Sequence, residues 1–160
     1  MKHRYALTVL MFVAAAIVFG VAAQGNKSTV VRKQVSLKSG GKEITAIELE
    51  NTHKRFYRDP FAPPMSPNRC SLVNTAEGVI WRIVCEGKDI SAKEVSLDDE
   101  SGRKFIQTCW TKQGTVYTTD ANGQRTGGGP RTEFLVAGPE DSKKVKITFG
   151  DASAEVEIPK

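Results

Sequence analysis

The C-terminal end of the chain alternates apolar and polar residues with a period of two. In residues 143–149, Val145, Ile147 and Phe149 alternate with Lys and Thr, and the alternation resumes in residues 153–158 after a Gly-Asp pair. Successive side chains of a β-strand point to opposite faces, so this pattern is typical of strands buried on one face. Two such strands separated by a turn signal predict a β-hairpin.

The rest of the chain supports an all-β fold. Segments rich in β-branched residues are bounded by Gly, Asp, Asn or Pro, and beyond residue 23 no segment repeats apolar residues with helical spacing. Short strands with turn signals between them indicate an immunoglobulin-like β-sandwich of about seven or eight strands. The expected strands are 30–38, 43–49, 78–86, 93–98, 103–108, 132–137, 143–149 and 153–158.

The apolar positions of these strands predict the core of the sandwich. On a half-buried strand, an apolar residue that lies between two polar residues points inward. The residues expected to fill the core are Trp81, Ile83, Val95, Leu97, Phe105, Phe134, Val145, Ile147, Phe149, Val156 and Ile158.

Two segments do not fit a minimal sandwich. Residues 51–77 contain Pro60, Pro63, Pro64 and Pro67, and residues 110–131 contain a tight-turn signal at 120–123 and the run Gly-Gly-Gly-Pro at 127–130. We expect both to be long loops. Long loops in compact domains often carry function, although each of these could instead be a tolerated insertion.

The N-terminus has the pattern of a secretory signal peptide. Lys2 and Arg4 precede an apolar run over residues 5–23, which ends in Val-Ala-Ala. A basic start, a short apolar stretch and a small-residue exit predict cleavage after Ala23, with an uncleaved membrane anchor as the alternative. We therefore expect a secreted or periplasmic protein with a flexible lead-in at 24–29 and a single domain at 30–160.

The charge of the chain is mildly basic. The formal net charge is +5, and two of the positive charges, Lys2 and Arg4, lie in the expected signal peptide. The other Lys and Arg residues are interspersed with Asp and Glu and form no basic block. A surface that binds nucleic acid needs clustered positive charge, so we do not expect a nucleic-acid partner.

Two stretches together resemble a known family. Residues 80–105 read IWRIVCEGKDISAKEVSLDDESGRKF, and residues 134–150 read FLVAGPEDSKKVKITFG. This order of signals resembles the telokin-like immunoglobulin-fold domains of bacterial exported proteins, of the secreted mycobacterial antigen type. The resemblance covers roughly residues 78–158 and implies a fold and an exported location, but no defined reaction. The chain departs from the family pattern at Ala137-Gly138-Pro139, where the family has Val-Pro, and in its two long segments.

Metal binding is not expected. His53 is the single histidine after the signal peptide, and the chain has no CxxC or HxxH spacing. Structural zinc sites normally show such paired spacing. The acidic run Asp98-Asp99-Glu100 lacks the alternating ligands of a calcium loop, so we interpret it as a solvated turn. No metal or other cofactor is predicted.

The sequence also contains no recognisable catalytic motif. A Ser or Cys nucleophile needs a base within hydrogen-bond reach, and His53, beside Lys54 and Arg55, is the one imidazole available after the signal peptide. No G-x-S-x-G elbow is present. We therefore expect a protein that is not an enzyme; an enzyme without a recognisable motif is the less favoured alternative.

The chain has three cysteines, Cys70, Cys85 and Cys109. Exported proteins form disulfides where the geometry permits. Cys85 and Cys109 end strands that we expect to finish at the same pole of the sandwich, which predicts a Cys85–Cys109 bridge. A Cys70–Cys109 bridge and three reduced thiols are the alternatives.

A cluster of cationic and aromatic residues at 53–61 is the strongest candidate for a binding site. Arg55, Tyr57, Arg58 and Phe61 could together contact an anionic or carbohydrate-like group. The alternative is that Phe56, Tyr57 or Phe61 packs under the loop while the charges face solvent. The leading hypothesis is a binding or interaction module whose partner is a protein or an envelope component. A structural or assembly domain of the cell envelope is the alternative.

Overall fold

The structure, a computed structural model, describes residues 28–58, 72–119 and 121–159. The expected signal peptide, Phe61 and Cys70 lie outside these ranges. Among the described residues, no helix is long and apolar enough to cross a membrane.

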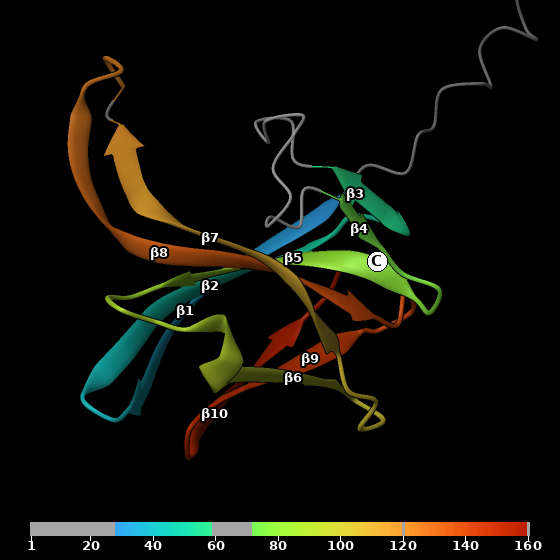
Figure 1. Ribbon diagram of the computed structural model, residues 1–160. Coiled ribbons are helices and arrows are strands. Elements are labelled where there is room, and N and C mark those ends of the chain that lie inside the picture. The colour runs from blue at the N-terminus through green and yellow to red at the C-terminus, as the bar shows by residue number, and fades with distance from the viewer. Residues whose placement is uncertain (1–27, 59–71, 120, 160) are drawn as a thin grey trace, which may run out of the picture.

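A five-stranded antiparallel sheet forms the larger layer of the fold. Its strands follow the order β1-β2-β5-β8-β7, and each pairs with its neighbour in antiparallel register. Figure 1 shows this sheet crossing the molecule above the smaller layer. The strands are β1 (Thr29–Ser39), β2 (Lys42–Asn51), β5 (Val79–Glu86), β8 (Arg125–Gly138) and β7 (Ile106–Thr119).

A three-stranded antiparallel sheet packs against one face of the larger sheet. Its order is β10-β9-β6, and a short 3-10 turn, Ala92–Glu94, leads into β6. The predicted hairpin at the C-terminus is confirmed, with Val156 opposite Val145 and Ala152 opposite Phe149. The strands are β6 (Val95–Asp99), β9 (Lys144–Phe149) and β10 (Ala152–Glu157).

The strand order is that of an immunoglobulin sandwich. In a constant-type immunoglobulin domain, strands A, B, E and D form one sheet and strands C, F and G form the other. Here β2-β5-β8-β7 stand in the places of A-B-E-D, β6, β9 and β10 stand in the places of C, F and G, and β1 adds an edge strand. The expected all-β, immunoglobulin-like sandwich is therefore confirmed.

The core lies between the two sheets. It contains the residues predicted for it, except that Ile158 is only partly buried at its margin. It also contains residues of β2 that the prediction missed, Ile44, Ile47 and Leu49. The burial pattern of β2 changes phase between Ile44 and Ile47, opposite a bulge in β1 between Gln34 and Leu37. Because the alternation does not keep one phase, the sequence predicted the strand at 43–49 but not which of its residues face inward.

The prediction of a long loop at 110–131 is wrong. These residues extend β7 and β8 into a hairpin that runs beyond the sandwich, visible at the upper left of Figure 1. Pro130 fits into β8 because its carbonyl faces away from β7 and accepts a hydrogen bond from the Gly87 N–H. In an antiparallel strand the N–H and C=O of one residue point the same way, so the missing N–H of Pro130 does not interrupt pairing with β7.

The segment expected as a second long loop, 51–77, also contains strands. β3 (Phe56–Arg58) and β4 (Leu72–Asn74) pair with each other in a small sheet of their own. With these two strands the described residues form ten strands rather than the seven or eight expected. Strands of three residues are too short to give a periodic signal in the sequence. The tertiary contacts described below hold them in place.

Candidate functional site

The small sheet of β3 and β4 covers one end of the outer face of the five-stranded sheet. We call this small sheet, together with residues 52–55 that lead into it, the flap. Tyr57 of β3 points inward and lies edge-on to Trp110 of β7, with ring centroids 5.6 Å apart. Val73 of β4 packs with Trp110 and with the outward-facing Ile80 and Leu135 of the large sheet. This second apolar cluster holds the flap in place from below.

Backbone hydrogen bonds fix the start of the flap to β5. The Thr52 N–H donates to the Ile80 carbonyl at 3.2 Å, and the Ile80 N–H donates to the Lys54 carbonyl at 2.7 Å. The Thr75 N–H then donates to the Arg55 carbonyl at 3.0 Å. The chain therefore enters the flap along a defined path, which orients the side chains that follow.

His53 lies at the base of the flap and has a structural role there. Its φ of 53° is in the left-handed region, and its N–H donates to the Asn51 side-chain oxygen at 2.9 Å. Its Nδ1 lies 3.1 Å from Glu140 Oε1, and Asn51 Nδ2 donates to the Glu140 carbonyl at 3.1 Å. The imidazole considered as a catalytic base thus contacts a carboxylate on the neighbouring loop.

The outer surface of the flap carries exposed positive charge beside an exposed ring. Lys54, Arg55 and Arg58 are exposed, and their side chains form no ion pair or hydrogen bond with any described residue. Phe56 is 49% exposed, and it is one of three exposed large apolar side chains among the described residues, with Val30 and Ile106. On a strand, Phe56 and Arg58 share one face because they are two residues apart.

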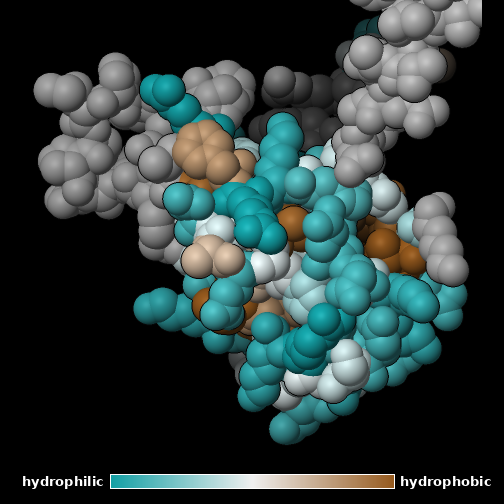
Figure 2. Space-filling model, turned by 90° about the vertical axis from the view of Figure 1, so that its right-hand side faces the viewer, coloured by the Kyte–Doolittle hydropathy of each residue, from teal (hydrophilic) through white to brown (hydrophobic). Residues whose placement is uncertain are grey.

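Three other described arginines, Arg32, Arg82 and Arg103, are neutralised by nearby carboxylates. Arg32 pairs with Glu86 at 2.7 Å, and Arg103 pairs with Asp99. The unpaired guanidinium groups of the flap therefore differ from these arginines. Figure 2 shows a mostly hydrophilic face on which apolar residues form only small, separate patches.

The predicted binding residues do not all share this surface. Arg55 and Arg58 are exposed as expected, but Tyr57 is half-buried against Trp110 and anchors the flap. The exposed ring is that of Phe56, its neighbour in sequence. Phe61 lies outside the described residues. The alternation over residues 56–58 could have separated the inward Tyr57 from the outward Phe56 and Arg58.

Beside the flap, the outer face of the large sheet holds an ion cluster that the sequence analysis missed. Arg82 of β5 contacts Glu50 at 2.8 Å and Glu48 at 3.2 Å, both from β2, and Glu133 of β8 at 2.8 Å. Burial favours the neutral form of Arg82, but hydrogen bonds to Glu133 and Glu50 outweigh it and raise its pKa. The cluster ties three strands together on a partly buried surface.

The turn expected to be solvated is instead partly buried. The side chain of Asp99 is 0% exposed and accepts hydrogen bonds from the N–H groups of Ser101 and Arg103 and from the Arg103 guanidinium, at 2.6 to 2.9 Å. Burial opposes ionisation, but these hydrogen bonds prevail and lower the pKa of Asp99. Asp99 therefore caps the turn, because its short side chain reaches three donors at once.

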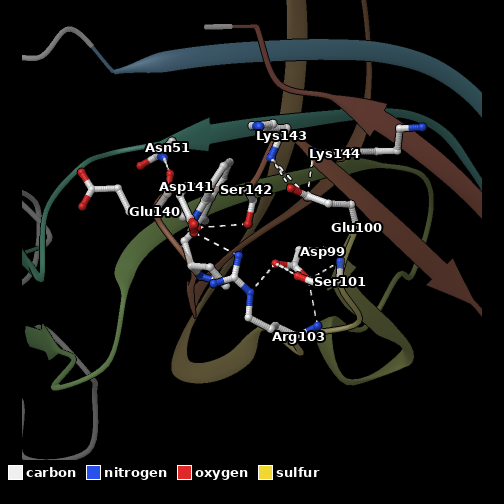
Figure 3. A network of polar contacts seen from close by, with 12 residues as sticks. Asn51, Asp99, Glu100, Ser101, Arg103, Glu140, Asp141, Ser142, Lys143 and Lys144 are labelled. Atoms are coloured by element: carbon white, nitrogen blue, oxygen red, sulfur yellow. Dashed lines mark hydrogen bonds and ion pairs between the residues drawn. The ribbon is translucent and has the colours of Figure 1, made fainter.

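Figure 3 shows that this turn belongs to a polar network at one pole of the sandwich. Arg103 also pairs with Asp141 at 3.0 Å, and Glu100 accepts hydrogen bonds from the N–H groups of Lys143 and Lys144. The network joins the loop after β6 to the loop before β9. Within the described ranges, no three His, Cys, Asp or Glu residues are arranged to hold a metal ion.

The predicted Cys85–Cys109 bridge is not formed. Cys85 is a free, fully buried thiol in the core between the sheets, and burial raises its pKa to about 12. Its strand β5 and the strand of Cys109, β7, are separated by β8 in the same sheet. Next-nearest strands lie roughly 9–10 Å apart, beyond the Cα separation that a disulfide spans. Cys70, in the alternative bridge, lies outside the described residues.

Comparisons with protein-family models, with curated proteins and with solved structures found no match for this chain.

Proposed function

We propose that this chain is an exported, non-enzymatic binding module that recognises an anionic partner through the outer surface of the flap. The supporting observation is that three cationic residues close in sequence to the exposed Phe56, namely Lys54, Arg55 and Arg58, are themselves exposed and have no carboxylate partner among the described residues. The location outside the cytoplasm is part of the proposal and comes from the expected signal peptide at residues 1–23.

The chemistry of this surface suits a partner with both negative charge and an apolar or sugar-like face. Exposed guanidinium groups attract carboxylate, sulfate or phosphate groups and can bind them in a bidentate manner. An aromatic ring beside them supplies contact area at low entropic cost. Because Tyr57 and Trp110 already hold the flap in place, binding does not have to order it first.

A structural or assembly domain of the cell envelope is the second proposal. It is favoured by the ion cluster around Arg82, which stiffens the outer face of the large sheet rather than forming a cavity. Enzymatic activity is not proposed, because the described imidazole, His53, contacts Glu140 and not a nucleophile.

Two probes of defined chemistry test the flap surface: a heparin-derived sulfated oligosaccharide and a Glu-rich peptide. The double variant Arg55→Ala/Arg58→Ala removes two flap charges. The matched control, Lys88→Ala/Lys93→Ala, removes two exposed charges whose side chains also form no ion pair or hydrogen bond with described residues. We expect the flap variant to lose at least tenfold in affinity for one of the probes, about 1.4 kcal/mol, and the control to lose much less.

Equal losses in the two variants would show that only the net charge matters. In that case the flap would be no recognition surface, and the structural proposal would replace the first. The affinity of the wild-type protein should also fall as salt is added, because the contacts are between exposed charges.

A further inference from the structure

The hairpin of β7 and β8 continues past the end of the strand beside it. β5 pairs with β8 from Arg131 to Gly138 only, whereas β7 pairs with β8 out to Thr119 and Arg125. The distal part is thus a two-stranded ribbon, which Figure 1 shows curving away from the sandwich. An isolated two-stranded ribbon is at best marginally stable in water, and its edges offer unpaired backbone groups to another strand.

The direction of each backbone group on β7 follows from Pro130. Pro130 lies opposite Thr115, and its carbonyl faces away from β7 toward Gly87. In antiparallel pairing, the backbone N–H and C=O groups of two opposed residues either point toward each other or point away from each other. The N–H and C=O of Thr115 therefore point to the free edge of β7. Gln113 and Tyr117 lie two residues to either side of Thr115 in the regular segment between the two register shifts, so their N–H and C=O groups also point to the free edge.

The two edges of the ribbon differ in whether they can accept a further strand. The edge of β8 carries Pro130, which lacks an N–H, and a run of glycines at 127–129. The edge of β7 has no proline in its whole length, and its segment 115–119 reads TVYTT, a composition that favours strands. No described strand pairs with this edge of β7. The open side of the ribbon is therefore the β7 side.

We propose that the free edge of β7 pairs with the same edge of a second copy of this chain, in antiparallel register about a twofold axis at Thr115. In this register Gln113 lies opposite Tyr117 of the other copy, and Thr115 lies opposite itself. Outward-pointing N–H and C=O groups then meet one another, which gives roughly six interchain hydrogen bonds. The two five-stranded sheets would join into one continuous sheet across the dimer.

The charges of β7 fit pairing with a second copy. Lys112 is the one charged residue of β7, and in this register it lies opposite Thr118 of the other copy rather than opposite its own equivalent. Like charges directly opposed on paired strands destabilise the pair, and this register avoids them. It also centres the pairing on the regular segment between the register shift that ends at Thr111 and the one after Thr118.

The substitution Thr115→Pro tests the pairing. It removes an N–H that points outward, as Pro130 does across the ribbon, and so leaves the bonds between β7 and β8 in place. Thr115→Val keeps the N–H and is the control. In sedimentation equilibrium of the purified protein, wild type and Thr115→Val should form dimers, and Thr115→Pro should raise the dissociation constant at least tenfold. Unchanged circular dichroism would show that the fold is retained.

A second variant gives a result even if Thr115→Pro perturbs the ribbon. Directly opposed residues of a hydrogen-bonded pair have Cα atoms about 5.5 Å apart, within the range of a disulfide. Thr115→Cys should therefore form a covalent dimer on mild oxidation, identified as a bridge between the two introduced thiols by peptide mapping. Lys112→Cys, offset from its twofold equivalent, should not. A wild-type protein that sediments as a monomer at all concentrations, or equal cross-linking of both variants, would overturn the proposal.

Discussion

The ring of Tyr57 lies edge-on to the ring of Trp110, with an interplanar angle of 66° and a centroid distance of 5.6 Å. This contact joins β3 of the flap to β7 at the edge of the large sheet, two segments that are far apart in the sequence. Edge-to-face aromatic pairs contribute about 0.5–1.5 kcal/mol beyond the burial of their surface. Together with the cluster around Val73, the contact explains how strands of three residues persist.

The first prediction concerns this anchor. Tyr57→Ala should lower the free energy of unfolding by about 1–3 kcal/mol, because it removes a half-buried ring and its partner contact. Hydrogen exchange of the Ile80 N–H, which bonds to Lys54 at the start of the flap, should accelerate. Tyr57→Phe keeps the ring and its contact with Trp110, so it should accelerate exchange less than Tyr57→Ala does. Slow exchange in the alanine variant would mean that the flap does not depend on Tyr57.

The second prediction concerns the core. Phe149 is 1% exposed and lies between the sheets, so Phe149→Ala should cost about 3–5 kcal/mol in a chemical denaturation experiment. The neighbouring Thr148→Ala, on the other face of β9, should cost less than about 1 kcal/mol. Similar small losses in both variants would contradict the strand register described here.

The third prediction concerns the cap at Asp99. Its pKa is lowered in the folded protein, so its contribution to stability is present above the unfolded value of about 3.9 and is lost as pH falls through the folded value. Asp99→Asn should destabilise the protein by about 1–2 kcal/mol at pH 7, since a charged acceptor of buried hydrogen bonds becomes neutral. The difference between wild type and variant should shrink below about pH 4. A difference that is constant with pH would exclude the carboxylate as its cause.

The fourth prediction concerns Cys85. Because burial raises the pKa of this thiol to about 12, it is protonated at neutral pH and shielded from reagents. Iodoacetamide should label Cys85 only after the protein is unfolded. Peptide mapping without reduction should find no Cys85–Cys109 peptide, and its detection would require a different arrangement of β5 and β7.

Local patterns in the sequence were sufficient to predict the β-sandwich and most of its core. The alternation in β9 and β10 predicted their bounds to within a residue or so, and the predicted core residues lie between the sheets. The ribbon was missed because Gly and Pro runs usually end strands. Here they occur where β8 has no partner on one side, so the missing N–H of Pro130 interrupts no strand pairing of β8.

The parts of the candidate site that were missed depend on contacts between distant segments. Arg82 meets Glu48, Glu50 and Glu133 because β5 lies between β2 and β8, an order that no single segment encodes. The expected pairing of Cys85 with Cys109 failed for the same reason, since it assumed which strands are neighbours. The exposed charges at 54–58 were found because they are adjacent in sequence.

The measurement that tests the proposed function most directly is affinity capture from the native envelope and extracellular fractions. Wild-type protein, the triple variant Arg55→Ala/Phe56→Ala/Arg58→Ala and the control Lys88→Ala/Lys93→Ala would each be used as bait. Phe56 is replaced rather than Tyr57, because Tyr57 anchors the flap. We expect wild type and control to retain the same anionic partner, and the triple variant, folded by circular dichroism, to lose it. A folded triple variant that retains this partner as well as wild type does would contradict it.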